Sequence, residues 1–510
     1  MLEILNRWSH GLVLIPVMDA LAETGCTQQW AMVRHVDFER ESKTYGLNRG
    51  YFMSVLRLLE GIGWLGRPSA GIFPVLQEFA AHEAIPDGML DLYEFPFDRY
   101  AVGEPVGSLA RWLDKAGGDW GSVHDRMPDY LDGPLCIPLF LSLRKSLEAG
   151  GGADVQGKTT VLRDVHNLPD WGAIRHLFER AGWSGRNGGQ GKDIVLTPAG
   201  KYLWDRCPVT AALASYRPMF RQALTLLREN PAAVFAPTPD GHERHVDRTL
   251  NVVGSGFQHE KYFSALESMV IGIFDNLDFE EQPGCIADTG CGDGTLLRRI
   301  YSVIAEKTLR GRNLEAFPLA LVGVDFNEKA LDAARKTLAG LPGRMIKGDI
   351  GDPEGIVDAI RGLGIDPESV LHIRSFLDHD RPYSPPTDRK AVEAWRKIPI
   401  AGTHIDATGD LLEAAEVARS TVEHLERWSR CINRHGLLLL EVHAMFPEKT
   451  GKYLDESESA HFDVYHAMSR QYLLDARTFQ ACAAQNGLLS GPGSWLCFPL
   501  RLPFTRISVN

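Results

Sequence analysis

The stretch Cys285–Ile300, "CIADTGCGDGTLLRRI", decides the fold. A short apolar segment ends in an acid, three glycines follow at alternate positions, and a helical run comes next. This pattern predicts a strand, a tight turn and a helix. Glycine in such a turn lets the backbone bend sharply and come close to a ligand. By itself the turn fits either a ligand-binding loop or a plain connection between strand and helix, so the surrounding sequence has to decide.

Short apolar segments alternate with helical runs from the glycine turn to the C-terminus. Four of them are typical of buried strands, and a fifth is typical of a late edge strand: "LALVGVDF", "MIKGDI", "SVLHIRSF", "GLLLLEVHA" and "SWLCFPLRL". This alternation predicts an α/β fold with a doubly wound, Rossmann-like sheet. We expect this sheet within residues 241–510, as the C-terminal domain.

Acids end the first three expected strands, at Asp288, Asp325 and Asp349. Ligands of such sheets bind beyond the carboxyl ends of the strands. The G-x-G-x-G spacing differs from the dinucleotide fingerprint G-x-G-x-x-G, and Asp288 and Asp293 are unfavourable next to a pyrophosphate. We expect Asp325 to accept the hydroxyls of a ribose and Asp349 to accept the amino group of an adenine. Together these acids indicate the S-adenosylmethionine site of a class I methyltransferase.

The expected cofactor-binding residues combine the acids with the glycines of the turn and with two residues that directly follow an acid. They are Asp288, Gly290, Gly292, Gly294, Asp325, Phe326, Asp349 and Ile350. Each acid alone is more often a turn former at the end of a strand. The pattern is specific because acids stand at three successive strand ends beside a glycine turn.

The fourth expected strand leads into the ionisable turn "HIRSFLDHDRPYSPP". In this fold the end of that strand faces the transferred methyl group. A dense set of ionisable side chains after an apolar strand favours an active site over a solvated polar loop, which is the alternative. We therefore expect Arg374, Asp378 and His379 to be catalytic.

Further donor side chains follow the fifth expected strand, where Glu441 and His443 stand, and continue into "HFDVYHAMSRQYL". Histidines with a carboxamide suit a divalent or ferric metal, so we expect His443, His466 and Gln471 to be its ligands. No pair has a spacing as diagnostic as HExxH. A straight helix would point His466 and Gln471 about 140° apart, so a shared metal requires a break in that helix. The alternative is that these side chains only pack over the sheet.

The first half of the chain contains two similar segments. "LVLIPVMDAL" resembles "LCIPLFLSLRKSL", and "YFMSVLRLLEGIGWLG" resembles "AIRHLFERAGWSG"; the second pair is followed by "GIFPVLQEFA" and "DIVLTPAGKYL". The order of helices and short strands predicts two winged-helix-like subdomains, at about 1–125 and 126–240. The expected recognition helices are poor in basic residues, with Arg57 in one and Arg175 and Arg180 in the other. A lid or a dimerisation platform is therefore favoured over a DNA-binding role.

The composition is that of an ordinary soluble globular protein with several domains. A formal net charge of −12 disfavours a nucleic acid as the main partner. The eight cysteines form no CxxC pair, which favours a reducing cytoplasm. The N-terminus lacks the features of a signal peptide, and no apolar run reaches the roughly 20 residues that span a membrane. Neither a nucleic acid nor a membrane is expected as a partner, whereas a homodimer is.

Several segments resemble the C-methyltransferase domains of polyketide-synthase loading modules, such as those of the apratoxin and saxitoxin assembly lines. The resemblance rests on "HVDRTLNVVGSGFQHEKYF", "IADTGCGDGTLL", "VGVDFNEKAL", "GDIGDPEGI", "HIRSFLDHDRPY" and "EVHAMFP". It covers roughly 240–510 well and the first half more loosely. It implies an iron centre beside S-adenosylmethionine and carbon methylation of a malonyl-type acyl group on a carrier protein. The chain shows no carrier segment, so a free β-dicarbonyl or 2-oxo acid is an alternative acceptor.

Methylation at carbon and at oxygen make different demands on a protein. A carbon acceptor first loses a proton next to a carbonyl, and a bound metal would stabilise the enolate that forms. A neutral histidine could take that proton. An oxygen acceptor needs only a base. We therefore expect a metal-dependent C-methyltransferase of secondary metabolism, with a small-molecule O-methyltransferase as the alternative and a DNA-associated regulator that binds S-adenosylmethionine as a remote one.

Overall fold

The computed structural model describes residues 1–76, 85–118, 120, 125–156, 159–185, 193–239, 243–491, 493–500 and 502–510, without the side chains of 156, 255 and 258–261. The end of the expected segment "GIFPVLQEFA" lies outside these residues. The chain divides into two compact units. The first comprises Met1–His259, Ala407–Leu411 and Pro447–Ser469, and the second Glu260–Asp406, Leu412–Phe446 and Arg470–Asn510.

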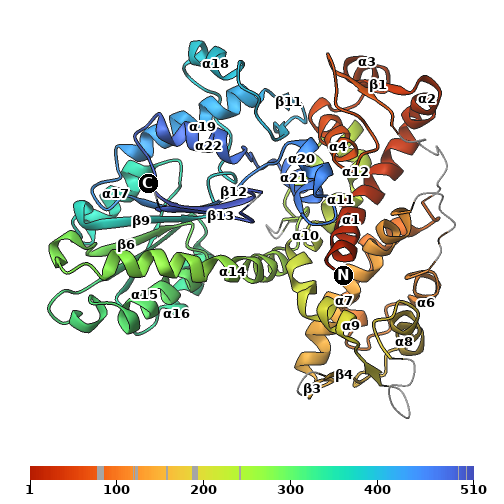
Figure 1. Ribbon diagram of the computed structural model, residues 1–510, viewed down its shortest axis with the longest axis horizontal. Helices are drawn as coiled ribbons and strands as arrows, with labels where there is room; N and C mark the ends of the chain where they lie inside the picture. Colours follow the sequence, from red (N-terminus) through yellow and green to blue (C-terminus); the bar gives the residue numbers. More distant parts are fainter. Residues whose placement is uncertain are drawn as a thin grey trace. The chain divides into compact units, whose positions relative to one another are not determined.

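The second unit is built on one sheet, which has seven strands within the described residues (Figure 1). These strands are β6 Cys285–Thr289, β7 Ala320–Asp325, β8 Gly343–Lys347, β9 Val370–Ser375, β12 Leu437–Val442, β13 Trp495–Phe498 and β14 Thr505–Val509. They lie in the order β13-β14-β12-β9-β6-β7-β8. The five strands from β12 to β8 are parallel, and β14 runs antiparallel to both β12 and β13.

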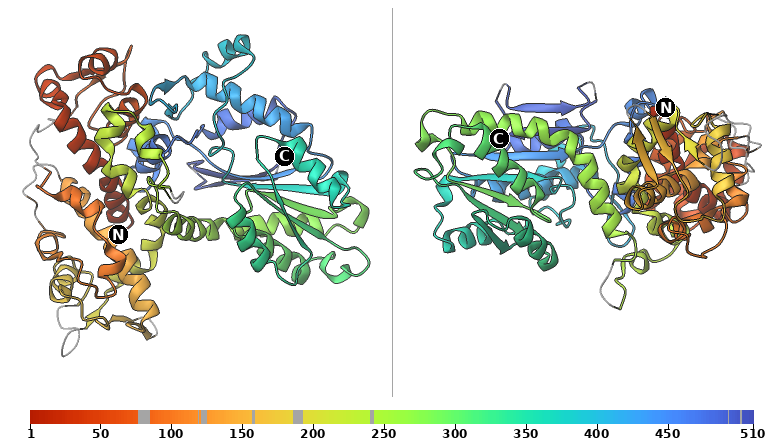
Figure 2. Two further views of the ribbon diagram at one scale, coloured as in Figure 1. Left: turned by 180° about the vertical axis from the view of Figure 1, so that it is seen from behind. Right: turned by 90° about the horizontal axis from the view of Figure 1, so that it is seen from below.

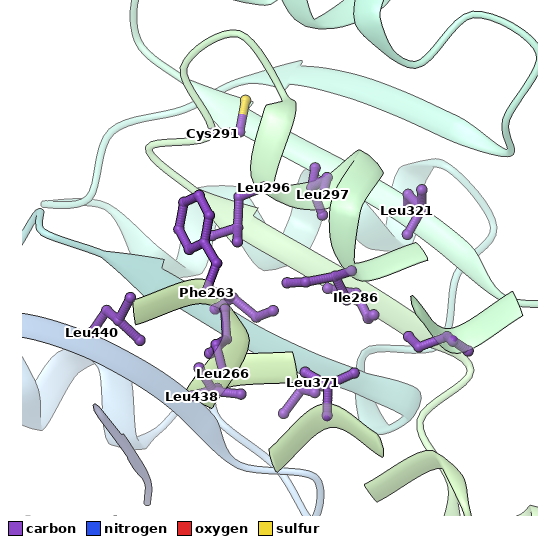
Figure 3. Close-up of a cluster of buried hydrophobic side chains, with 14 of the residues drawn as sticks. Phe263, Leu266, Ile286, Cys291, Leu296, Leu297, Leu321, Leu371, Leu438 and Leu440 are labelled. Atoms are coloured by element: carbon purple, nitrogen blue, oxygen red, sulfur yellow. The ribbon is translucent and has the colours of Figure 1, made fainter. Parts of the chain in front are cut away.

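Helices cover both faces of this sheet (Figures 1 and 2). One face packs against α14 Arg248–Phe274, α15 Thr295–Lys307 and α16 Glu328–Thr337. The other face packs against α17 Pro353–Gly362, α19 Ala414–Ser429 and α22 Ala476–Ala484, and α18 Arg389–Trp395 belongs to this second layer of helices. Side chains alternate between the faces along each strand. Leu438 and Leu440 of β12 therefore join the first core (Figure 3), whereas Leu437 and Leu439 join the second.

The strand order places a topological switch at β6. From β6 the chain proceeds outward through β7 and β8 on one side, and through β9 and β12 on the other. Ligands of doubly wound sheets bind beyond the carboxyl ends of the strands at such a point. The predicted α/β fold and the predicted late edge strand β13 are confirmed. Strand β14 was not predicted, and β8 ends at Lys347, two residues before the expected Asp349.

The first unit is mainly helical. Its helices are α1 Leu2–Thr24, α2 Cys26–Val33, α3 Phe38–Thr44, α4 Arg49–Gly61, α5 Phe97–Tyr100, α6 Ala110–Leu113, α7 Met127–Ala149, α8 Trp171–Arg180, α9 Pro198–Arg206, α10 Ala211–Ala214, α11 Arg217–Arg221, α12 Ala223–Arg228, α13 Ala232–Phe235, α20 Pro447–Lys452 and α21 Ser459–Met468. Helices α20 and α21 belong to this unit although they follow β12 in the chain.

The two long helices with similar sequences, α1 and α7, pack against each other at equivalent glycines. A Cβ atom added to Gly11 would lie 2.0 Å from the carbonyl oxygen of Tyr130, and one added to Gly133 would lie 2.1 Å from that of Trp8. Each glycine stands five residues before a proline, Pro16 or Pro138. The similarity that the sequence shows therefore corresponds to a close contact between the two helix backbones.

The second copy of the repeat is the fuller winged-helix-like segment. It carries an antiparallel three-stranded sheet of β3 Ala153–Gln156, β4 Thr159–Leu162 and β5 Ile194–Val195. In the described part of the first copy, β1 His35–Asp37 pairs with β2 Ile72–Pro74. In both copies a glycine with positive φ follows a helix, as predicted: Gly63 follows α4, and Gly182 follows α8. Among the described helices of the chain, none combines the length and the apolar character needed to cross a membrane.

Candidate active site

The glycine turn after β6 folds as its sequence predicts. Gly290, Gly292 and Gly294 have φ values of 79°, 54° and 76°, a region that other residues rarely adopt. The backbone N–H groups of Gly290 and Cys291 donate to the carbonyl of Val324, which ties the turn to β7. A Cβ atom on Gly292 would meet no described atom within 4 Å. The turn thus leaves open space directly above its middle glycine.

Asp288 lies inside β6 and is only 2% exposed. Its Oδ1 atom is buried and has no hydrogen-bond partner among the described residues. Burial, reinforced by the charge of Asp325, raises the pKa of this carboxyl to about 8. A buried carboxylate without a donor is costly, so the site favours a ligand that brings a donor or a positive charge.

Asp325 ends β7 and connects to the glycine turn. Its Oδ2 atom accepts a hydrogen bond from the N–H of Gly292 at 3.1 Å, and its Oδ1 atom accepts one from Asn327 at 2.8 Å. The next residue, Phe326, is 72% exposed. The carboxylate and the exposed ring stand side by side in sequence at the open end of the sheet.

The third acid lies in the loop after β8. Asp349 is exposed, and its Oδ1 atom accepts from the N–H of Gly351 at 2.7 Å. Ile350 is buried, and its carbonyl accepts from the indole N–H of Trp428 at 2.9 Å. The remaining acid of the region, Asp293, accepts from the N–H of Thr295 and so forms part of the turn into α15. We call residues 288–294, 325–326 and 349–350 the glycine edge.

At the end of β9 and in the turn after it, the ionisable side chains Arg374, Asp378, His379 and Arg381 are buried, whereas Asp380 is exposed; we call residues 374–381 the buried turn. Arg374 and Asp378 form an ion pair at 3.1 Å with both side chains fully buried. Asp378 also accepts from His424 of α19 at 3.1 Å, and the guanidinium lies 4.6 Å from the ring centroid of Trp428. Burial acts against the charged form of Asp378, but Arg374 and His424 outweigh it, so the pKa of this carboxyl is lowered.

His379 forms a second pair with Glu441 of β12. Its Nδ1 atom lies 2.6 Å from Oε1 of Glu441, and both side chains are buried. The other carboxylate oxygen accepts from the backbone N–H groups of Asp378 and His379. Burial alone would lower the pKa of the imidazole, but the Glu441 carboxylate more than offsets it, so the pKa of His379 is raised. The three predicted catalytic residues thus lie together at the end of β9 and in the turn that follows it.

Two residues that contact the buried turn, Glu441 and His424, were not among the predicted catalytic residues. Glu441 was recognised only as a residue at a strand end, and His424 was not singled out at all. His424 lies in "ARSTVEHLERW", on the buried side of an amphipathic helix. From sequence alone, a histidine at such a position is interpreted as an ordinary core residue. A signal for Glu441 exists, because an acid inside an otherwise apolar strand requires a buried partner.

The predicted metal ligands remain a prediction. His443 is buried, and its Nε2 atom has no hydrogen-bond partner in the part of the chain that the structure covers. Gln471 donates to Asp380 at 2.9 Å, while its Oε1 atom is buried without a partner among those same residues. His466 lies on α21 of the first unit, where Nδ1 donates to the carbonyl of Phe462. The described residues contain no group of three or more His, Cys, Asp or Glu side chains able to hold a metal ion.

Three family models match the chain. The model described as the AprA MT2-like domain matches residues 243–510, which is more than half of the chain. The AprA N-terminal domain matches residues 1–67, and the AprA winged helix domain matches residues 132–230. The last match coincides with the fuller of the two repeated segments, whereas residues 1–67 match a domain of a different description.

No curated protein matches the chain. Solved structures with a similar fold include an O-methyltransferase family protein from Burkholderia thailandensis, with 13% identity, a TM-score of 0.40, and coverage of 73% of this chain and 93% of that one. Another is an O-methyltransferase family 2 protein from Planctomyces limnophilus, with 10% identity, a TM-score of 0.37, and coverage of 99% and 94%. The citrinin polyketide synthase CMeT domain has 14% identity, a TM-score of 0.35, and coverage of 83% and 97%. Similarities at this level carry no argument about function.

Proposed function

We propose that this chain, which belongs to the AprA MT2-like family of S-adenosylmethionine-dependent methyltransferases, methylates a carbon atom next to a carbonyl group. The observation that carries the proposal is the buried His379–Glu441 pair at the carboxyl end of β9 and β12. A firmly held imidazole at this edge of the sheet could take the proton that a carbon acceptor loses before methylation. The acceptor class is a malonyl-type acyl thioester, a β-dicarbonyl or a 2-oxo acid of secondary metabolism, free or bound to a carrier protein.

The glycine edge has the chemistry to hold S-adenosylmethionine. The space above Gly292 admits a ligand close to the backbone. The carboxyl of Asp288, whose Oδ1 atom has no partner among the described residues, favours a positively charged group. Asp325 would accept the ribose hydroxyls, the exposed ring of Phe326 offers an apolar face to an adenine, and Asp349 is available for its amino group. When bound, this cofactor supplies an electrophilic methyl group on a sulfonium.

His379 is proposed as the proton acceptor. Because Nδ1 is engaged by Glu441, the neutral ring carries its hydrogen there and its lone pair at Nε2. Glu441 also favours the protonated ring that forms when a proton is taken from the acceptor. The raised pKa makes the neutral imidazole a stronger base, and it is neutral only above that pKa. Turnover should therefore rise with pH through a midpoint above 6.5, the ordinary value for histidine.

Arg374 and Asp378 are proposed to act through His379. Their ion pair is fully buried, so neither side chain is placed to meet an acceptor directly. Asp378 donates its backbone N–H to Glu441, which fixes the carboxylate that in turn holds the imidazole. These two residues therefore position the proton acceptor, as the groups around an active-site base must do if it is to keep one orientation.

The iron that the family resemblance implies is kept as a separate hypothesis. His443 and Gln471 each carry a buried donor atom without a described partner, which is compatible with a ligand. A complete ligand set is not present among the described residues, so the set fits only in part and no step of the proposal depends on a metal. Exhaustive dialysis against a chelator tests the hypothesis: loss of turnover that iron restores would support it, and unchanged turnover would remove it.

Methyl transfer with 13C-methyl-labelled S-adenosylmethionine tests the proposed function. Candidate acceptors are monomethyl malonate, malonyl thioesters, acetoacetate and 2-oxobutyrate, and the carbon chemical shift of the product methyl group separates carbon-bound from oxygen-bound methyl. We expect a carbon-bound methyl group. In D2O without cofactor, the protein should also exchange the acidic C–H of the acceptor for deuterium, and His379→Ala should not. An oxygen-bound methyl group, with no exchange, would overturn carbon methylation in favour of the O-methyltransferase alternative.

A further inference from the structure

A separate cavity of about 400 Å³ lies in the second unit between α22 and the sheet. Its floor is one face of β12, β14 and β13, and its cover is α22 with the chain that follows it. The residues that matter for its chemistry are Glu441, His443, Arg477, Phe479, Trp495 and Arg506. We call this cavity the β12–α22 pocket. Its volume is in the range of small-molecule sites, and neither the glycine turn nor the buried turn lines it.

Arg506 is the unusual member of this pocket. It is 8% exposed, its guanidinium lies 5.5 Å from the ring centroid of Trp495, and Nη2 donates to Ser490. Its Nε atom is buried without a hydrogen-bond partner among the described residues. Across the residues that the structure describes, no carboxylate lies within 4 Å of either Arg506 or Arg477. Two cations thus face one cavity without an ion-pair partner.

Glu441 is the cross-strand neighbour of Arg506, yet it does not neutralise it. The two residues are paired in the register of β12 and β14, where opposite charges ordinarily attract. The Glu441 carboxylate is instead turned to His379, and it also accepts from the backbone N–H groups of Asp378, His379 and Val442. With its lone pairs used in this way, Glu441 leaves the guanidinium of Arg506 without a counter-charge.

A buried cation without a partner is expensive, and an anionic ligand removes that cost. Arginine is well suited to the task, because its planar guanidinium binds a carboxylate in a bidentate manner. Nε and one terminal nitrogen are the usual pair of donors, and Nε of Arg506 is the atom that lacks a partner. The apolar wall from Phe479, together with the unpartnered Nε2 atom of His443, gives such a ligand a carbon-binding part and a second polar contact.

We propose that the β12–α22 pocket binds a small carboxylic acid, with the guanidinium of Arg506 as the anion partner and Phe479 against its carbon chain. The acid is either the free carboxylate of the methyl acceptor, a reading that rests on the proposed function, or a separate small acid that acts as an effector. Glu441 lines this pocket and also holds His379, so one carboxylate links the pocket to the proposed proton acceptor.

The first test is calorimetric titration of the full chain with acetate, monomethyl malonate and 2-oxobutyrate. Dimethyl malonate is the neutral control, because it keeps the size of the ligand and removes the charge. We expect at least one of the three acids to bind saturably, and dimethyl malonate to bind at least tenfold more weakly. Absence of binding by all three acids, or equal binding of monomethyl and dimethyl malonate, would overturn the proposal. Neither result depends on any variant being folded.

The second test uses Arg506→Gln with Arg430→Gln as a matched control, since Arg430 is an exposed arginine of the same unit that pairs with Glu426. Arg506→Gln should weaken acid binding roughly ten- to hundredfold, and Arg430→Gln should leave it unchanged. Retained S-adenosylmethionine binding shows that the variant is folded. If Arg506→Gln does not fold, Arg477→Gln with Phe479→Ala takes its place. Wild-type acid affinity in a folded variant would contradict the assignment of the anion site.

Kinetics distinguish the two sources of the acid. If the pocket holds the carboxylate of the acceptor, the acid that binds should inhibit methyl transfer competitively with the acceptor, and Arg506→Gln should raise KM more than it lowers kcat. If it holds an effector, inhibition or activation should be non-competitive. Acid binding without methyl transfer to any acceptor would refute the proposed function and leave this pocket standing. Methyl transfer to carbon by the wild type, with an acid affinity that Arg506→Gln does not change, would refute the pocket and leave the proposed function standing.

Discussion

The glycine edge and the buried turn lie at the same end of one sheet, yet they are built in opposite ways. The glycine edge is open: Gly292 faces empty space, Phe326 is exposed, and Asp288 keeps a carboxyl oxygen without a described partner. In the buried turn, Arg374 and Asp378 are fully buried and bound to each other. The glycine edge is open to a ligand, whereas the buried turn is closed around its ion pair, although Nε, Nη1 and Nη2 of Arg374 and Oδ2 of Asp378 have no hydrogen-bond partner among the described residues.

This difference corresponds to two tasks. A site that binds a charged cofactor gains from polar groups that stay unsatisfied until the ligand arrives. A base that must keep one orientation gains from neighbours that hold it in place, as Glu441 holds His379. Substitutions in the glycine edge should therefore affect cofactor affinity, and substitutions in the buried turn should affect stability or rate.

Asp378→Ala should show how much of the stability depends on the buried turn. The substitution leaves the Arg374 guanidinium buried without its carboxylate, which costs about 3–5 kcal/mol. Urea unfolding of the purified variant measures this loss. Asp358→Ala is the matched control, because it removes an exposed acid that pairs with Arg361 and should cost less than about 1 kcal/mol. Equal stability of the two variants would mean that the turn is not held by its ion pair.

Gly290→Val should abolish cofactor binding. A Cβ atom at this position would lie 2.8 Å from Leu377, and φ is 79°, so both the loop and the neighbouring turn would have to move. We expect a loss of about hundredfold or more in affinity for S-adenosylmethionine, which is about 2.7 kcal/mol. Gly340→Val is the control, because Gly340 has a φ of 83° but open space around it. Binding of normal strength by Gly290→Val would separate the turn from the cofactor site.

Asp325→Ala should weaken binding of S-adenosylmethionine about ten- to hundredfold. The reason is the loss of hydrogen bonds to a charged acceptor, about 1.5–3 kcal/mol, at the end of β7. Calorimetry gives the dissociation constant, and Asp332→Ala on the exposed side of α16 serves as the control. An unchanged constant would show that the ribose is bound elsewhere.

The affinity for S-adenosylmethionine should also depend on pH through Asp288. The free protein holds this carboxyl with a pKa of about 8, so at pH 7 most of it is protonated. A cation prefers the carboxylate, so binding releases a proton, and affinity should fall about fivefold from pH 8 to pH 7. Titrations in buffers of different ionisation enthalpy would detect the proton. Asp288→Asn should bind with little dependence on pH, and a flat profile in the wild type would contradict the role of Asp288.

The sheet and the glycine edge could be predicted because their signals are local. An apolar run that ends in an acid and a glycine turn needs no distant partner to be recognised. Strand β14 escaped prediction because "TRISV" is short and alternates polar with apolar residues at the end of the chain. It is nonetheless the strand that places Arg506 beside Glu441.

The buried turn was only half predictable. Its own residues cluster in sequence, but Glu441 and His424 reach it from 62 and 46 residues away, and only the folded chain brings them together. His466 illustrates the opposite case. It stands five residues from Gln471 in sequence, yet the boundary between the two units falls between them, at Ser469 and Arg470. The two predicted ligands thus belong to different units, and their shared site stays a prediction.

A paired comparison of His379→Ala and Asp325→Ala tests the division of tasks most directly. For each variant, calorimetry measures the dissociation constant of S-adenosylmethionine, and single-turnover methyl transfer under saturating cofactor measures the chemical rate. We predict that His379→Ala keeps the wild-type constant within about twofold and loses about 10²- to 10⁴-fold in rate. Asp325→Ala should lose affinity and keep most of its rate. If His379→Ala instead loses cofactor affinity while its rate at saturation is normal, the central claim that the two regions have separate tasks is contradicted.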